Sequence, residues 1–169
     1  MALPRMARLA LEAHLPLLQD GEYARRYGWQ VVIDWEAGFC YVRLACRFKS
    51  ASGEETHVYM LRLSFDHYDA EQPGVTFVNP ETRGVGTPEE FQKWWPMVDG
   101  NPWINIQIQQ PPEKSYLCFQ WTHEFKETHA PLDPKDPKHW DPKKHNIVGV
   151  VRTVQRALDS GYYKGYRQR

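Results

Sequence analysis

One stretch of alternating residues constrains the fold of this chain more than any other feature of its sequence. From Phe39 to Phe48 every second residue is apolar, and Arg43 and Arg47 occupy positions between them. Successive side chains of a β-strand point to opposite faces, so this pattern predicts a strand with one buried face. We expect that face to carry Cys40, Val42, Leu44, Cys46 and Phe48.

The segments around this strand predict an antiparallel meander. Ser50–Gly53 has the residues of a turn, and the following segment, His57–Phe65, alternates again with Tyr59, Leu61, Leu63 and Phe65 on one face. Further strands are predicted at Trp29–Trp35 and at 74–78. Because the connections between them are short, neighbouring strands are expected to run antiparallel.

Helices are predicted near both ends of the chain. Residues 4–19 form an amphipathic helix whose apolar residues at helical spacing are Met6, Leu9, Ala10, Ala13 and Leu17. Near the other end, Asp141 is the predicted N-cap of a helix and Pro142 its first residue. Its apolar stripe is Ile147, Val150, Val151, Val154 and Leu158.

The middle of the chain carries weaker signals. Thr87–Glu90 has the spacing of a capping box and predicts a short helix that continues to about Trp95. After the break at Pro96–Pro102, alternating isoleucines predict a strand over 104–108. A further strand-like segment, Ser115–Trp121, contains Cys118.

Composition excludes several classes of protein. The 169 residues have a formal net charge of zero, which argues against a nucleic-acid-binding protein. No apolar run approaches the roughly 18 residues of a membrane span. The chain has three cysteines, and no pair of them forms a C-x-x-C motif. A disulfide scaffold is therefore not expected, and a reducing cytoplasm is the predicted location.

Cys118 differs from the other two cysteines. Cys40 and Cys46 fall on a predicted buried face, where a thiol acts as a small hydrophobe. Cys118 lies where a predicted strand gives way to a loop rich in Pro and His, and His123 and His129 follow it. The residues alone leave three interpretations open: a buried structural thiol, a reactive Cys–His pair, or a metal site formed by these three residues.

The order of the motifs resembles that of the ubiquitin-conjugating enzyme (E2) family. The matching motifs are Pro73-Gly74-Val75-Thr76-Phe77 at the fourth strand, Leu117-Cys118, and Trp140-Asp141-Pro142 before the last helix. The loop from Cys118 to Trp140 is similar to that of bacterial E2-like proteins. The resemblance implies an α+β fold of the UBC/E2 type, with an N-terminal helix, a four-stranded antiparallel meander, an active-site loop and a C-terminal helix. Residues 1–169 would form one such domain, with an insertion at 81–110.

The resemblance also implies an activity. Cys118 would carry a ubiquitin-like protein as a thioester and pass it to an acceptor protein, in a bacterial conjugation pathway such as one of antiviral defence. The partners would be an E1-like activating enzyme, the ubiquitin-like modifier and the acceptor; no cofactor, metal, nucleic acid or membrane is required. His123 or His129 would deprotonate the acceptor amine or polarise the thioester. In the N-terminal helix, Arg5 and Arg8 would dock the E1.

The chain departs from the family in one motif. E2 enzymes usually carry His-Pro-Asn before the cysteine, and that Asn supports attack by the acceptor amine. Here Asn101 and Asn105 are the candidates for supporting the oxyanion or the amine. Two alternatives remain: an E2-like or RWD-like binding scaffold in which Cys118 is structural, and a metal-binding domain that uses Cys118, His123 and His129.

Overall fold

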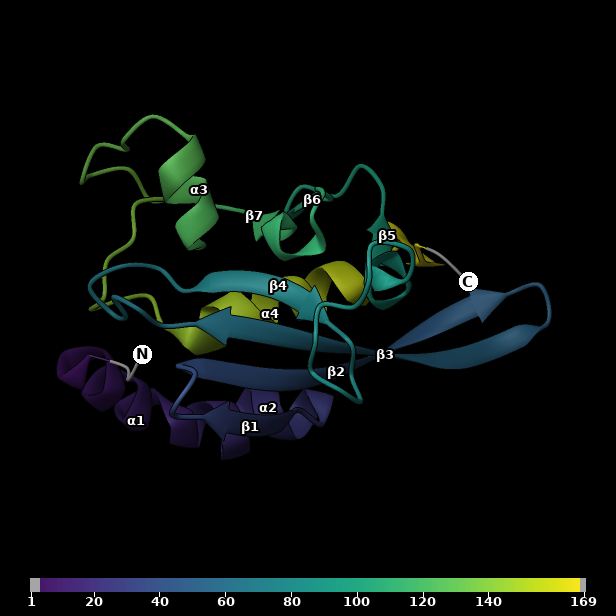
Figure 1. Cartoon of the computed structure of the whole chain (residues 1–169), viewed down its shortest axis with the longest axis horizontal. Helices are drawn as coiled ribbons and strands as arrows, with labels where there is room; N and C mark the ends of the chain where they lie inside the picture. The colour runs from purple at the N-terminus through teal and green to yellow at the C-terminus, as the bar shows by residue number, and fades with distance from the viewer. Residues whose placement is uncertain (1–3, 168–169) are drawn as a thin grey trace.

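A four-stranded antiparallel sheet forms the centre of the molecule (Figure 1). The computed structural model describes residues 4–167. The strands follow one another in space as in sequence, in the order β1-β2-β3-β4. Their bounds are Gln30–Asp34, Phe39–Ser50, Gly53–Ser64 and Gly74–Val78. The predicted meander is confirmed.

The long hairpin of β2 and β3 buries the predicted faces, except that Phe48 is only half-buried. Cys40 pairs with Leu63, and Leu44 pairs with Tyr59. On the inward face, Cys40, Val42, Leu44, Cys46, Tyr59, Leu61 and Leu63 are each at most 3% exposed. The turn end of the hairpin projects beyond the rest of the sheet (Figure 1).

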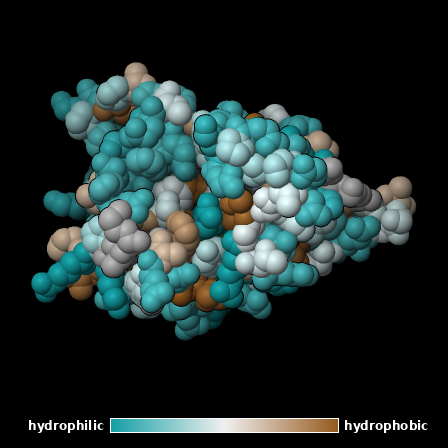
Figure 2. All heavy atoms as spheres, in the orientation of Figure 1, coloured by the Kyte–Doolittle hydropathy of each residue, from teal (hydrophilic) through white to brown (hydrophobic). Residues whose placement is uncertain are grey.

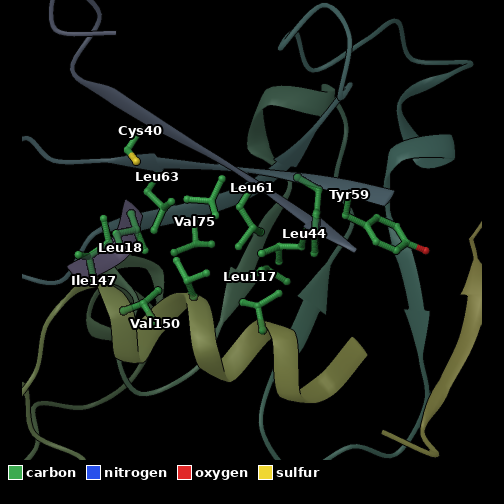
Figure 3. Close-up of a cluster of buried hydrophobic side chains, with 14 of the residues drawn as sticks. Leu18, Cys40, Leu44, Tyr59, Leu61, Leu63, Val75, Leu117, Ile147 and Val150 are labelled. Carbon is green, nitrogen blue, oxygen red and sulfur yellow. The ribbon is translucent and has the colours of Figure 1, made fainter. Parts of the chain in front are cut away.

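The main core lies between the inward face of the sheet and two helices, α1 (Arg5–Asp20) and α4 (Ile147–Leu158). The predicted stripe of α4, from Ile147 to Leu158, is fully buried. Figure 3 shows side chains of β2, β3 and α4 filling one space, together with Leu117. Burying each such side chain contributes about 1.5–3 kcal/mol, so this contact is a main source of stability.

One buried polar residue fixes how α4 lies on the sheet. Gln155 is 1% exposed, and its Nε2 donates to the carbonyl oxygen of Ala45 in β2 at 2.9 Å. Its Oε1 accepts the indole N–H of Trp29 at 3.1 Å. Because an unpaired buried amide is costly, these bonds favour one position of the helix.

The predicted buried face of α1 is wrong, although the helix itself is confirmed. Its buried residues are Ala7, Leu11, Leu15 and Leu18. Met6, Leu9 and Leu17 are 75%, 50% and 49% exposed. The helix carries two apolar stripes, and only the contact with α4 and β1 decides which one is buried.

The predicted start of α4 is also wrong. The N-cap is Asn146, not Asp141, and its side chain accepts the N–H groups of Val148 and Gly149. The N–H of Ile147 is bound by the buried Tyr68 hydroxyl at 3.0 Å. The helix therefore begins where its first apolar residue enters the core, and residues 141–145 form a turn and a short connection.

Short elements connect these main parts. The predicted helix after Thr87 is a single 3-10 turn, η1 (Phe91–Trp94), without a side-chain cap. Two short strands follow it, β5 (Pro96–Val98) and β6 (Asn105–Gln107), so the strand predicted over 104–108 is confirmed in part. Three further elements were not predicted: α2 (Glu22–Tyr27), α3 (His123–Thr128) and β8 (Tyr163–Tyr166).

The segment 81–110 is joined to the rest of the fold by both of its strands. β5 pairs with β8, and β6 pairs with β7 (Tyr116–Cys118), which follows the 3-10 turn η2 (Pro112–Lys114). Its description as an insertion relative to E2 proteins stays a prediction. None of the helices found between residues 4 and 167 has the length and apolar character needed to cross a membrane.

Candidate active site around Cys118

The position of Cys118 is set by its neighbour in β7. Leu117 is fully buried and points into the core beside α4 (Figure 3). Cys118 is the last residue of the strand, and Asn105 of β6 lies directly opposite it. Directly opposed residues of antiparallel strands share a face, with Cβ atoms about 4.5–5.5 Å apart. The thiol therefore has an amide side chain as its cross-strand neighbour.

A tight turn after β7 brings α3 next to the cysteine. Thr122 is fully buried, and its hydroxyl donates to the carbonyl oxygen of Phe119 at 2.9 Å. The hydroxyl oxygen of Thr122 also accepts the N–H of Phe125 at 3.3 Å and so caps α3. The N–H of His123 is bound by the carbonyl oxygen of Pro73 at 3.0 Å, which ties the helix to the start of β4.

Cys118 borders an open hollow of about 230 Å³. The loop from Asn101 to Asn105 lines part of it, and Phe125 and His129 of the α3 region line another part. Only 7% of Cys118 is exposed, so most of the residue is covered while it still borders the hollow. Figure 2 shows one face of the molecule, on which hydrophilic residues predominate and apolar atoms are visible between them.

Thr128 connects the thiol to the imidazole. Its Oγ1 lies 3.9 Å from the sulfur of Cys118 and 3.0 Å from Nδ1 of His129. The hydroxyl donates its own proton to the carbonyl oxygen of Glu124 at 2.7 Å. Its oxygen is therefore left to accept from both the thiol and the imidazole.

These contacts determine the tautomer of His129. Its ring stacks on Phe125 with centroids 4.0 Å apart, and Nδ1 also lies 3.1 Å from the carbonyl oxygen of Phe125. Both oxygen neighbours of Nδ1 accept hydrogen bonds, so Nδ1 carries the proton of the neutral ring. Nε2 then keeps its lone pair and can act as a base.

The thiol of Cys118 is held in its protonated form. Burial raises its pKa, and the negative charge of Glu124 raises it further. Burial raises the pKa of Cys46 to about 12 and that of Cys40 still higher. Cys118 borders an open hollow, whereas Cys40 and Cys46 lie within the main core.

Glu124 is a second unusual group near Cys118. Burial raises the pKa of its carboxyl to about 7. Its Oε1 accepts the N–H of Val75 at 3.3 Å, and its buried Oε2 has no partner in residues 4–167. The carboxyl therefore changes charge near neutral pH, and that charge acts on the thiol.

The two predicted histidines lie in different places. His129 lines the Cys118 hollow, but His123 lines a separate hollow of about 140 Å³. There its Nδ1 is 3.7 Å from Oε2 of Glu71. Among residues 4–167, no group of three or more His, Cys, Asp or Glu side chains is placed to hold a metal ion. The Cys118, His123 and His129 set is not brought together.

The two predicted asparagines also differ. Both line the hollow, but the Asn101 amide is used within its own loop. Its Oδ1 accepts the N–H groups of Trp103 and Ile104, and its Nδ2 donates to the carbonyl oxygen of Ile104 at 3.0 Å. Asn105 is exposed opposite Cys118, so it is the amide that is available to a ligand.

Glu124 and Thr128 were not among the predicted site residues, because α3 was not predicted. The signal was present: Thr122 is an N-cap residue, and an acidic residue stands in the first turn after it. The residues predicted for E1 docking, Arg5 and Arg8, lie on the exposed side of α1, far along the chain from this hollow. Arg8 pairs with Glu12 at 2.9 Å.

Comparisons with known proteins assign no family to this chain. No protein-family model matches it, and the search of curated proteins finds no match either.

The raised pKa of Glu124 predicts how stability depends on pH. The unfolded carboxyl ionises near 4.5, whereas the folded carboxyl keeps its proton until about pH 7. Wild-type protein therefore loses stability as pH rises through this window. Glu124→Gln does not titrate in this range. As pH rises through the window, the unfolding free energy of the variant should therefore increase by roughly 2–3 kcal/mol relative to that of wild type.

Urea unfolding of both proteins across this pH range measures the difference. Glu127→Gln is the matched control, because Glu127 is exposed on the same helix. That variant should follow the wild-type curve. Parallel curves for wild type and Glu124→Gln would show that Glu124 is not a buried, protonated group.

Proposed function

We propose that this protein is an E2-like conjugating enzyme that carries a ubiquitin-like protein as a thioester on Cys118. The observation that supports this most strongly is the hollow itself: a thiol at the end of β7 borders it with an opposed amide, Asn105, and an imidazole base, His129. The α+β architecture, with its N-terminal helix, four-stranded sheet and C-terminal helix, fits the same proposal.

In the first step Cys118 receives the modifier. Its sulfur loses a proton and adds to the carbonyl carbon of the thioester that joins the modifier to the E1-like enzyme. The thiolate of that enzyme leaves and takes up a proton, so one thioester replaces another and one thiol replaces another. Because the pKa of the Cys118 thiol is raised, little thiolate exists in the free protein, so the approach of the E1 complex must favour its formation.

In the second step an acceptor amine attacks the thioester carbonyl. The sulfur of Cys118 leaves as a thiolate, and the amine gives up a proton. Nε2 of His129 has the free lone pair to take that proton. The amide of Asn105 can donate to the oxyanion that forms on the carbonyl oxygen, the role for which the sequence offers no His-Pro-Asn.

The exposed side of α1 is the proposed E1-docking surface. Arg5, Arg8 and Leu9 are neighbours on the helix surface, and the 75% exposed Met6 stands beside Leu9. A basic surface with exposed apolar residues suits a protein partner better than solvent alone. The guanidinium of Arg8 also lies 4.8 Å from the centroid of the Trp35 ring, which holds it in place.

The proposal is tested by a charging reaction. The protein is mixed with the E1-like enzyme and ubiquitin-like protein of the same genome and with ATP, then run on a non-reducing gel. We expect an adduct that a thiol reagent removes. Cys118→Ser should lose it, while Cys40→Ala and Cys46→Ala should keep it wherever they fold.

A partner pair that charges the E1 but never transfers the modifier to this protein would contradict the proposal. The scaffold interpretation, with a structural Cys118, would then stand. A thiol-sensitive adduct that survives in Cys118→Ser would equally remove Cys118 from the proposed role.

The transfer step separates the two histidines. After charging, the reaction is stopped by removing Mg²⁺, and loss of the thioester to added lysine is followed with time. Loss of a general base typically costs about 10²-fold or more, so His129→Gln should discharge far more slowly than wild type. His123→Gln is the matched control and should discharge at nearly the wild-type rate, because His123 borders another hollow. Equal rates for the two variants would exclude His129 as the base.

A further inference from the structure

A second hollow, of about 330 Å³, lies along α4 and is lined by cationic and N–H-donating side chains. We name it the arginine hollow. Its lining includes the polar residues Lys144, His145, Asn146, Arg152 and Arg156 and the aromatic residue Trp121. Among the residues that the structure describes, no carboxylate lines it. The proposed function uses none of these residues.

The two arginines are held in place by aromatic rings instead of carboxylates. Arg152 lies over Tyr23, and Arg156 lies over Trp103, each with 4.3 Å between the guanidinium carbon and the ring centroid. Their i and i+4 spacing puts both on one face of α4. Within residues 4–167 neither makes an ion pair, so their positive charges are not neutralised by the protein.

The other lining groups add donors. Nδ1 of His145 accepts the backbone N–H of Asp141 at 3.0 Å, so the neutral ring carries its proton on Nε2. Burial lowers the pKa of His145, which favours that neutral form. Asn146 uses its Oδ1 to cap α4, which leaves its NH₂ group as a donor. Lys144 adds a positive charge, and its Nζ forms an ion pair with Oδ2 of Asp141 at 3.2 Å.

We infer that the arginine hollow binds a phosphate group. Planar guanidinium groups bind phosphate oxygens through paired N–H donors, and the neighbouring amide and imidazole N–H groups suit the remaining oxygens. The volume exceeds that of a bare phosphate ion, and the ring of Trp121 offers a flat surface to the rest of a phosphate ester. The ligand is either free phosphate or the phosphate of a small ester.

Isothermal titration tests the inference with two probes, inorganic phosphate and adenosine monophosphate, at constant ionic strength set with chloride. Wild-type protein should bind phosphate at millimolar concentrations or below. Tighter binding of the nucleotide would identify an ester as the ligand, and equal affinities would identify the phosphate group alone. Either result supports the inference.

Arg152→Gln and Arg156→Gln should each weaken binding about ten-fold or more, as expected for a lost hydrogen bond to a charged group. Glutamine matches arginine in helix propensity, so both variants should fold. Arg47→Gln is the matched control, because Arg47 is an exposed arginine of β2 that does not line the arginine hollow. It should bind like wild type.

Three results would overturn the inference. One is no heat from either probe with folded wild-type protein at millimolar concentrations. The second is a loss of affinity in Arg47→Gln as large as that in Arg152→Gln. The third is Arg152-dependent binding of a poly-glutamate peptide without any binding of phosphate, which would assign the arginine hollow to an acidic protein segment.

Discussion

The packing of α4 against the inward face of the sheet is the constraint on which the rest of the structure depends. The apolar stripe of the helix and the inward residues of β2 and β3 exclude water together, and Gln155 fixes their relative position through Ala45 and Trp29. Leu117 enters the same core. Because Leu117 cannot leave it without opening a cavity, the next residue, Cys118, stays at the edge of the core where β7 ends.

The groups around the hollow at Cys118 affect one another's protonation and position. Burial and the charge of Glu124 keep the thiol protonated, while Thr128 contacts both the sulfur and the ring of His129. Such a thiol reacts slowly with chance electrophiles but can still transfer an acyl group when a partner supplies the thioester in place. A thiol that stays protonated in the free protein is therefore consistent with an enzyme that reacts only when its partner is bound.

The sheet was predictable because period-2 alternation in β2 and β3 depends only on which residues face the core. The buried side of α1 was not, since Met6 and Leu11 belong to two apolar stripes and the sequence does not say which one meets α4. The start of α4 depended on Tyr68, which is distant in sequence and binds the first N–H of the helix.

Contacts between residues distant in sequence also decide which of the predicted site residues lie at Cys118. From spacing along the chain, His123 and His129 were equally good candidates for a base near Cys118. Asn101 and Asn105 were likewise equal candidates for the supporting amide. The position of α3 separates the histidines, and the hydrogen bonds within the Asn101 loop separate the asparagines. Both depend on tertiary contacts that no local pattern encodes.

The central claim is that Cys118 is the one thiol within reach of a reactant and that the free protein keeps it protonated. The rate of alkylation of each cysteine by iodoacetamide, followed by mass spectrometry as pH is raised, tests this directly. We predict modification of Cys118 alone in the folded protein, with a midpoint above the ordinary thiol pKa of 9.0. Modification of Cys40 or Cys46 at a similar rate, or a Cys118 midpoint below that value, would contradict it.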